Sequence, residues 1–434
     1  MSGLRKAIGS HGWTCAAVVS AFVTYYCMYA FRKPFAVLKF EGEWFGSGID
    51  LKSAAVVSQL IGYVTAKFLG TWVCSSLRRE DIWRALVICI GVALISLVLL
   101  GVLPANWAFA AMILNGLSLG MVWGMVMRPL EGRGQSELLL AGLCCSFIIA
   151  SGDVKSTGQW VLDSSWFASI FAGEAWMPLA TALIYLGPFS IAAFVLGRIP
   201  APTAEDINRR SDRVSMEREE RMRFVRELFW ILLPMAATYL MLTAFRDYRD
   251  NFQGELFEAV GVDLEENKQA FSQSERVVAF ATVALVSLAI VVRRHLLALR
   301  VSMILMMAGA AVAVGAIFLR KAGAIDGMTW MVLSGVGTYL SYILVHCLLF
   351  ERLVALTRMP GNSVFAMMLF DGIAYLGPIM VIPLSDIMLR DGGSRLEAFD
   401  VITWVLGGIS VASCLWVFLT LPRYQPVTGI DVVD

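Results

Sequence analysis

The feature that most constrains the fold of this chain is a series of long apolar stretches with very few charged residues. Each stretch approaches the roughly 20 residues that an α-helix needs to cross a bilayer. Hydrophobic residues make up 58% of the 434 residues and charged residues only 16%, against about 25% charged residues in soluble domains. The sequence therefore predicts an all-α membrane protein with about twelve transmembrane helices. The expected spans are 13–33, 53–76, 82–103, 105–128, 137–163, 177–197, 225–246, 275–293, 296–319, 327–350, 362–388 and 399–421.

One polar segment divides these spans into two sets of six. Residues 199–224 are rich in charge and begin with two prolines. We therefore expect an N-terminal six-helix bundle over 1–198, a cytoplasmic linker over 199–224 and a C-terminal six-helix bundle over 225–434.

Lysine and arginine gather in the loops on one side of the expected spans, which predicts that this side is cytoplasmic. Both chain termini fall on it. The basic N-terminus leads into an apolar run with no small-residue cleavage site, so we expect a first membrane helix rather than a signal peptide. The absence of a targeting sequence suggests a bacterial inner membrane. The residues that set the orientation are Arg5, Lys6, Arg78, Arg79, Arg84, Arg128, Arg133, Arg209, Arg210, Arg213, Arg218, Arg221, Arg223, Arg293, Arg294, Arg300, Arg352 and Arg358.

A phrase from the first half of the chain returns in the second half. Residues 24–32 read TYYCMYAFR, and residues 238–246 read TYLMLTAFR. The small-residue phrases at 116–120 and 334–337 repeat at a similar offset and predict close helix contacts. Together they predict a duplicated, pseudo-symmetric bundle, as in many transporters.

Each copy of the phrase places two polar side chains and its final arginine on one helical face, at i, i+4 and i+7. These residues are Tyr25, Tyr29 and Arg32 in the first copy, and Tyr239, Thr243 and Arg246 in the second. Matching polar stripes suggest two walls of one cavity. A guanidinium binds a phosphate or carboxylate through two parallel hydrogen bonds, so the arginines are candidate ligands for an anionic substrate.

An alternative remains for the two arginines. An arginine at the bilayer centre costs roughly 2.5–3.5 kcal/mol on insertion scales, unless it meets water, a partner or a ligand. Arg32 and Arg246 could instead end their helices and extend toward the lipid headgroups. Lys33 and Pro34 after the first arginine, and Asp247 after the second, leave this alternative open.

Six plus six helices with a charged linker is the layout of the major facilitator superfamily. Within it, YYCMYAFRKPF resembles the first helix of the organophosphate:phosphate antiporters, which include glycerol-phosphate and hexose-phosphate transporters. Arg32, Lys33 and Phe35 match the family phrase. The resemblance implies that Arg32 and the matching helix 7 residue, Arg246, bind phosphate, and that substrate is exchanged for inorganic phosphate.

Further phrases extend the resemblance. Lys67 in TAKFLG is similar to a helix 2 lysine that faces the phosphate site of the family. The residues 120–123 together with Arg128 resemble a helix 4 motif of the family. Residues 375–377 resemble a helix 11 motif less closely. The resemblance therefore implies that Lys67 assists the two arginines.

The chain also departs from the family. The family carries a histidine on helix 5, whereas this chain has Asp153 and Lys155 in that stretch. Cysteine at 74 replaces the aspartate of the superfamily signature after helix 2. Asp153 could pair with a cation such as Lys67 or carry a proton. Alternatively, helix 5 ends near Gly152 and both Asp153 and Lys155 meet water.

Two further polar residues lie deep in apolar spans. Asp371 lies nine residues into its span and could couple transport to protons, or form a hydrogen bond or ion pair between helices. His346 shares a helical face with Tyr339 and Tyr342. It could be a neutral structural histidine, a substrate contact or part of a proton relay.

These observations predict a monomeric secondary transporter that moves a small organic, phosphorylated anion by alternating access, with phosphate or a proton as the coupled ion. Arg32, Arg246 and Lys67 would bind the anion, and Tyr25, Tyr29, Tyr239 and Thr243 would line the pocket. Asp153, Asp371 and His346 are the candidate coupling residues. The alternative is a membrane sensor that binds an organophosphate without moving it. No enzyme motif, nucleic-acid patch, cofactor motif or metal-ligand cluster is found in the sequence.

Overall fold

The computed structural model describes residues 2–77, 79–127, 129, 136–200, 218–357 and 363–424. Within these residues the chain is helical apart from turns and short loops, and its β-structure is limited to one isolated bridge between Glu43 and Asp50. Several basic residues that predicted the orientation lie outside the described residues, namely Arg78, Arg128, Arg133, Arg209, Arg210, Arg213 and Arg358.

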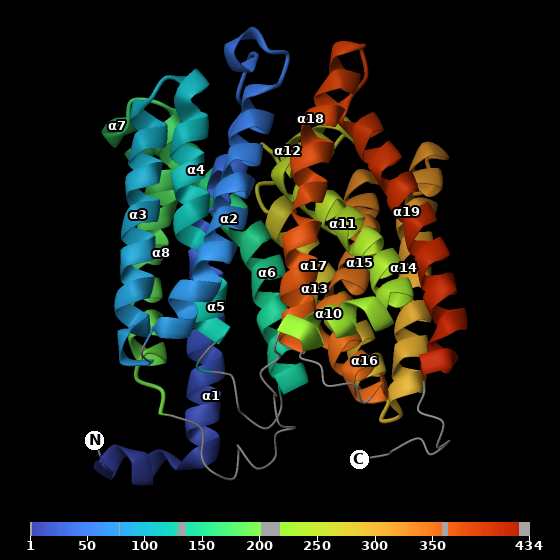
Figure 1. The fold of residues 1–434 in the computed structure, drawn as a ribbon. Helices are drawn as coiled ribbons and strands as arrows, with labels where there is room; N and C mark the ends of the chain where they lie inside the picture. The colour runs from blue at the N-terminus through green and yellow to red at the C-terminus, as the bar shows by residue number, and fades with distance from the viewer. Residues whose placement is uncertain are drawn as a thin grey trace. The chain divides into compact units, whose positions relative to one another are not determined.

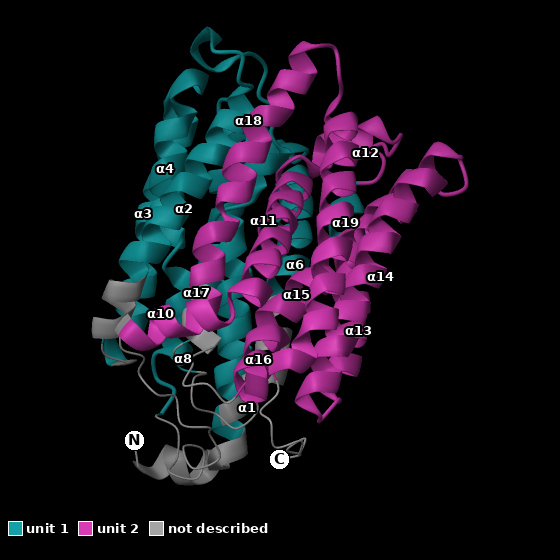
Figure 2. Ribbon diagram, turned by 45° about the vertical axis from the view of Figure 1, so that its right-hand side comes forward, with its two compact units in different colours: residues 1–211, 268–273 teal, residues 212–267, 274–434 magenta. Residues whose placement is uncertain are grey.

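The chain divides into two compact units, which Figure 2 colours separately. Unit 1 comprises Met1–Ser211 and Lys268–Gln273. In it α2 packs along α4, α1 packs against α6 and α8, and α3 contacts both α4 and α8 (Figure 1). Its helices are α1 Ser2–Met28, α2 Leu51–Ser76, α3 Ile82–Val102, α4 Ala108–Leu119, α5 Val122–Met127, α6 Ser136–Leu162, α7 Ser165–Ile170 and α8 Met177–Leu196.

Unit 2 comprises Asp212–Asn267 and Ser274–Asp434. In it α11 packs against α18 and α19, and α14 contacts both α15 and α19 (Figure 1). Its helices are α10 Arg218–Glu227, α11 Phe229–Asn251, α12 Gln253–Ala259, α13 Ala270–Ile290, α14 His295–Lys321, α15 Gly327–Leu344, the π-helical turn η7 Val345–Leu349, α16 Phe350–Thr357, α17 Ser363–Ala374, α18 Leu376–Arg390 and α19 Arg395–Thr420.

Two helix pairs are shared by the two units. The first span packs on the sixth in both, as α1 on α8 and α11 on α19. The third packs on the fourth in both, as α3 on α4 and α14 on α15. The duplication that the repeated phrases predict is therefore present in the packing of each six-helix bundle.

The expected spans correspond to helices of the structure. Among the described residues, nine helices are long and apolar enough to cross a membrane. The other three expected spans correspond to α1, α2 and α6. The span expected over 275–293 begins five residues earlier, because α13 starts at Ala270 with the polar residues 272–276, which lower the hydropathy there.

The two copies of the repeated phrase end differently. In the first copy α1 gives way to a short 3-10 turn, η1 Tyr29–Phe31, and Arg32 caps that turn. Pro34 follows, and proline has no N–H with which to continue a helix. The second copy has no proline at this place, so α11 continues five residues past Arg246 to Asn251. Arg246 therefore lies inside a helix rather than at the end that the sequence predicts.

The small-residue phrases lie where helices come closest, as predicted. A Cβ added to Gly116 on α4 would lie 2.0 Å from the carbonyl oxygen of Gln59 on α2. In unit 2, a Cβ on Gly337 of α15 would lie 2.4 Å from the carbonyl oxygen of Gly309 on α14. Only glycine allows the two backbones to approach this closely.

The predicted linker is only partly within the described residues. Residues 201–217 lie outside them, and the last seven residues of the predicted linker belong to the helix α10. The domain boundaries at 198 and 225 stay a prediction.

Candidate functional site

In unit 1, Arg32 lies against an aromatic ring. Its side chain is buried, and its guanidinium carbon lies 4.2 Å from the centroid of the Tyr63 ring on α2. The ammonium nitrogen of Lys67, one turn further along α2, lies 5.4 Å from the same centroid. The structure thus brings Arg32 and Lys67 to one tyrosine. Sequence reasoning missed Tyr63, although its i, i+4 spacing to Lys67 was a usable signal.

A buried polar network holds the backbone that carries Arg32. The Gln59 side-chain amide donates to the carbonyl of Arg32 (3.2 Å) and to the side-chain oxygen of Asn115 (2.8 Å). Asn115 in turn donates to the carbonyl of Phe31 (3.0 Å) and to Ser96 Oγ (2.9 Å). A helix end leaves carbonyls without intrahelical partners, and these amides satisfy two of them. The network therefore fixes the point from which Arg32 projects.

The two predicted pocket tyrosines of unit 1 lie in an aromatic group. Tyr25 contacts Trp123 edge-to-face, with ring centroids 4.7 Å apart, and contacts Tyr29 in the same way at 5.7 Å. Both tyrosines are buried. Edge-to-face pairs hold rings in fixed orientations, so these tyrosines form a rigid wall beside the stretch that ends in Arg32.

Asp153 lies within a continuous helix, because α6 extends to Leu162 and does not end near Gly152. Its carboxylate accepts a hydrogen bond of 2.6 Å from the hydroxyl of Tyr26. Lys155 is also buried, with its ammonium nitrogen 5.9 Å from the centroid of the Phe271 ring. The alternative in which helix 5 ends near Gly152 is therefore wrong, and Lys155 does not meet water as that alternative expected.

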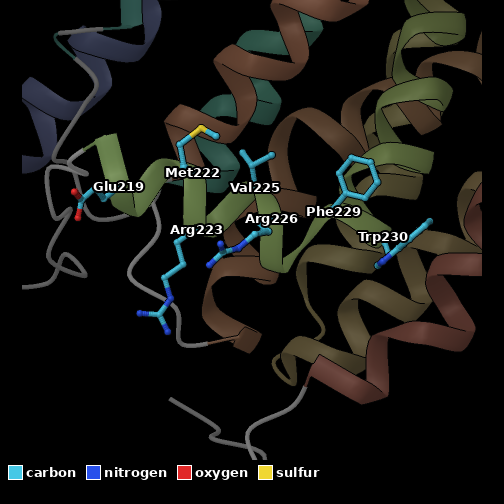
Figure 3. Close-up of a pocket in the computed structure, with 7 residues that line it drawn as sticks. All are labelled: Glu219, Met222, Arg223, Val225, Arg226, Phe229 and Trp230. Carbon is cyan, nitrogen blue, oxygen red and sulfur yellow. The ribbon is translucent and has the colours of Figure 1, made fainter.

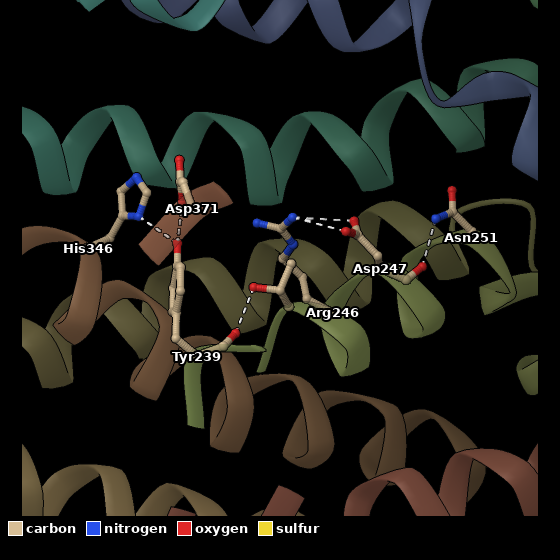
Figure 4. Close-up of polar contacts among 7 residues, drawn as sticks. Tyr239, Arg246, Asp247, Asn251, His346 and Asp371 are labelled. Atoms are coloured by element: carbon tan, nitrogen blue, oxygen red, sulfur yellow. Dashed lines mark hydrogen bonds and ion pairs between the residues drawn. The ribbon is translucent and has the colours of Figure 1, made fainter. Parts of the chain in front are cut away.

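In unit 2, Arg246 also lies over a tyrosine ring. Its guanidinium carbon is 4.5 Å from the centroid of Tyr342 on α15, and its side chain is 12% exposed. One guanidinium nitrogen lies 3.3 Å from both carboxylate oxygens of Asp247 (Figure 4). Such contacts are longer than the 2.7–2.9 Å typical of strong charged hydrogen bonds. Asp247 thus neutralises Arg246 without binding it closely.

The two arginines of the repeat therefore share one kind of contact. Each guanidinium lies 4.2–4.5 Å from a tyrosine centroid, within the range of a cation–π contact. Both side chains are largely buried, which argues against the alternative in which they extend from helix ends toward the lipid headgroups.

Tyr239, one of the predicted pocket residues, is the centre of a polar chain in unit 2. Its hydroxyl donates to Asp371 Oδ1 on α17 (2.9 Å) and lies 3.1 Å from Nδ1 of His346. Figure 4 shows both side chains converging on this hydroxyl. Its ring also stacks on Tyr342, the ring beneath Arg246, at 5.3 Å. The structure thus joins two candidate coupling residues through a candidate pocket residue.

Thr243 differs from its expected role. Its hydroxyl donates to the carbonyl of Tyr239 one turn earlier on α11, at 2.8 Å. A threonine in a helix commonly bonds back to this carbonyl. The bond engages the donor of Thr243, so this side chain has only acceptor capacity left for a substrate.

His346 lies in an unusual piece of helix. The turn Val345–Leu349 is π-helical and joins α15 to α16 within one continuous span. Such turns widen the helix by one residue and are frequent at functional sites. The imidazole stacks on Tyr342 one turn earlier, with centroids 5.5 Å apart.

A buried ion pair in unit 2 was not predicted from the sequence. Arg249 donates to Glu275 at the start of α13 (2.6 Å) and to the carbonyl of Met331 on α15 (3.0 Å). Gln253 donates to the same Glu275 oxygen at 2.8 Å. Both charged side chains are 1% exposed. The pair ties α11, α13 and α15 together.

A groove lies where α10 meets α11 (Figure 3). Its volume is about 570 Å³, and it is lined by Glu219, Met222, Arg223, Val225, Arg226, Phe229 and Trp230. Arg223 donates to Glu227 at 2.7 Å, and this ion pair raises the pKa of the guanidinium. Arginines before exposed aromatic rings are typical of a membrane–water boundary, so the groove marks where the first span of unit 2 begins.

Most of the chain matches the model of one protein family. The model of a family described as "Family of unknown function (DUF5690)" matches residues 34–423, which is most of the chain. The chain belongs to the DUF5690 family. A comparison of this DUF5690 chain with curated proteins gives no match.

Solved structures with a similar fold cover nearly the whole DUF5690 chain. A D-xylose-proton symporter has a TM-score of 0.59 and 14% identity, with 96% of this chain and 98% of that chain covered. A bacterial homolog of the human lysosomal transporter Spinster has a TM-score of 0.60 and 13% identity, covering 97% and 100%. The nucleoside transporter NupG has a TM-score of 0.59 and 13% identity, covering 95% and 100%. The protein therefore has the major facilitator fold.

Proposed function

We propose that this protein is a secondary transporter that carries a small organic anion, preferably a phosphorylated one, across the cytoplasmic membrane by alternating access. The observation that carries the proposal is the pair of arginines at the ends of the repeated phrase, each over a tyrosine ring in its own unit. The structural neighbours support transport, because they are a D-xylose-proton symporter, a bacterial homolog of a lysosomal transporter and a nucleoside transporter. The polypeptide works as a monomer with both termini in the cytoplasm.

The arrangement suits an anion for a chemical reason. When a guanidinium lies over an aromatic ring, the ring contacts its face while the N–H groups point outward along its edge. Those N–H groups match the oxygens of a phosphate or carboxylate. Lys67, on the same ring as Arg32, adds a second positive charge in unit 1. Within its own unit each arginine has aromatic side chains on the same stretch, Tyr25 and Tyr29 in unit 1 and Tyr239 in unit 2, and these would contact the organic part of the substrate.

The test is uptake by purified protein in proteoliposomes. The probes are radiolabelled glycerol 3-phosphate and glucose 6-phosphate, with succinate as a carboxylate and xylose and uridine as uncharged compounds. Internal inorganic phosphate tests exchange. Transport of an organophosphate supports the proposal. Transport of only xylose or uridine would contradict it, and binding without uptake would favour a sensor.

Arg32→Lys and Arg246→Lys keep the positive charge but lose the paired hydrogen bonds. Hydrogen bonds to charged groups contribute about 1.5–3 kcal/mol, so each variant should take up low concentrations of the anion about 10- to 100-fold more slowly. Arg84→Lys in unit 1 and Arg223→Lys in unit 2 change exposed arginines and serve as matched controls. Full activity in both Arg32→Lys and Arg246→Lys would refute the role of the arginines.

A further inference from the structure

The chain of Tyr239, His346 and Asp371 has a property that a simple pocket wall does not need. Its distances, 3.1 Å and 2.9 Å, fit hydrogen bonds running in either direction. In one arrangement His346 Nδ1–H donates to the Tyr239 oxygen, and the Tyr239 hydroxyl donates to the ionised carboxylate of Asp371. In the other, a protonated Asp371 donates to Tyr239, and Tyr239 donates to Nδ1 of a histidine whose proton is on Nε2.

The two arrangements differ by one proton. A proton that arrives on His346 Nε2 allows Nδ1–H to pass its proton to Tyr239 while Tyr239 passes its own to Asp371. The arrangement with a neutral Asp371 results, and no heavy atom has to move. The chain can thus accept one proton at the imidazole and hold it at the carboxylate.

Charged and titratable side chains adjoin this chain. Arg246 on α11 lies over the ring of Tyr342, which stacks on Tyr239, and the carboxylate of Asp247 lies beside the Arg246 guanidinium. A proton on Asp371 would reduce the negative charge near this group.

We propose that Tyr239, His346 and Asp371 form a proton-binding site whose proton travels with the anion held at Arg246, which makes the protein a proton–anion symporter. The inference rests on the proposed function and specifies its coupled ion. An anion at Arg246 adds negative charge beside the chain of Tyr239, His346 and Asp371, so it strengthens proton binding. By reciprocity the proton strengthens anion binding by the same factor, typically about 5- to 150-fold for coupled sites.

The packing provides a physical connection between the proposed anion at Arg246 and the proposed proton site. Tyr342 lies beneath the Arg246 guanidinium and stacks on both Tyr239 and His346. Any shift of Arg246 toward an anion therefore changes the surroundings of the ring that supports the proton chain. The π-helical turn that carries His346 gives this contact a segment that can adjust.

Two measurements in the same proteoliposomes separate the coupling from the transport itself. The first is exchange of labelled glucose 6-phosphate at equal pH on both sides, which needs the anion site but no net proton movement. The second is accumulation of the same compound driven by an inwardly directed pH gradient. We expect the parent protein to do both, and Asp371→Asn and His346→Gln to keep exchange and lose gradient-driven accumulation. Tyr339→Phe, which removes another buried phenol hydroxyl of α15, serves as the control and should behave as the parent.

A measurement without substrate tests the proton site alone. Infrared titration of the reconstituted parent should show a carboxylic acid C=O band that appears as pH falls and is missing in Asp371→Asn. Should Asp371→Asn not fold, His346→Gln should still shift the pH at which the band appears. Exchange in the parent without accumulation and without this band would overturn the proton site. Loss of exchange and accumulation in the parent would instead refute the proposed function.

Discussion

A single tyrosine ring changes what a buried arginine can do. Tyr63 and Tyr342 each support one guanidinium of the repeat at 4.2 Å and 4.5 Å. A cation–π contact is worth about 2 kcal/mol when it is desolvated, which offsets part of the cost of burying the charge. The ring occupies only the face of the guanidinium, so the proposed anion would be bound through its edge.

Arg249 should behave in the opposite way, as a structural charge. Arg249→Met leaves Glu275 buried without its ion partner, and removing one partner of a buried pair typically costs about 3–5 kcal/mol. We expect a large drop in thermal stability in detergent. The double variant Arg249→Met/Glu275→Leu should recover most of the loss, because paired apolar replacements are often nearly neutral. Equal losses in the single and double variants would show that the ion pair is not the cause.

The residues of the candidate site were predictable only where their own helix carried the signal. The spacing within each copy of the phrase places Tyr239 and Arg246 on one face from the sequence alone. Tyr63, Arg249 and Glu275 gain their meaning from partners on other helices, and one sequence does not specify which helices meet. His346 and Asp371 could be suspected from depth in an apolar span, but their meeting at Tyr239 required the fold.

At the scale of single helices, ends and close contacts depend on a few residues. Pro34 ends the first helix soon after Arg32, whereas α11 continues past Arg246 because nothing interrupts it. Helix spans were predictable from hydropathy because the bilayer demands long apolar segments. The ends of the helices were less predictable from hydropathy. The polar start of α13, for example, is stabilised by buried contacts such as that of Gln253 with Glu275.

Gly116 tests the close contact of α2 and α4. Gly116→Ala places a methyl group against the carbonyl of Gln59, and overpacking of this kind typically costs about 1–3 kcal/mol. Thermal unfolding should therefore occur at a lower temperature. Gly91→Ala on α3 is the matched control, because its added methyl meets no atom within 4 Å, and it should leave stability unchanged or slightly raised. Equal effects in the two variants would contradict the close contact.

Asp326, the N-cap residue of α15, makes a pH-dependent contribution to the stability of the fold. Its carboxylate accepts a hydrogen bond of 2.6 Å from the backbone N–H of Thr329, and this bond lowers the pKa of Asp326 below its usual 3.8. A lowered pKa means that the cap stabilises the fold above about pH 4 and that this contribution is lost as pH falls through the folded-state value. Asp326→Ala should cost about 1 kcal/mol at neutral pH. Thermal scans should show this difference shrink below pH 4, and a difference that is the same at every pH would exclude an ionised cap.

At the scale of the whole molecule, the duplication places the same short motif in two units, where its surroundings differ. The first span packs on the sixth in both units, so each arginine comes from the equivalent span. The residues after it have diverged, with Lys33 and Pro34 in one copy and Asp247 and Tyr248 in the other. The unit 2 copy connects its arginine, through Tyr342 and Tyr239, to a histidine and a carboxylate. The fold was predictable from the sequence because its repeat and span count are encoded locally, whereas this asymmetry was only partly visible there.

The short segment Lys268–Gln273 has a consequence for how the protein is made. It belongs to unit 1, where Lys268 forms an ion pair with Asp163 (2.8 Å) and the backbone N–H of Ser272 donates to Ser156 (3.2 Å), yet it follows α11 and α12 in the chain. Domains form in order during synthesis, starting from the N-terminus. Unit 1 is therefore still incomplete when the ribosome has synthesised α1 to α8. It waits for the first three helices of unit 2, α10, α11 and α12, to be synthesised, so the two halves cannot mature independently during translation.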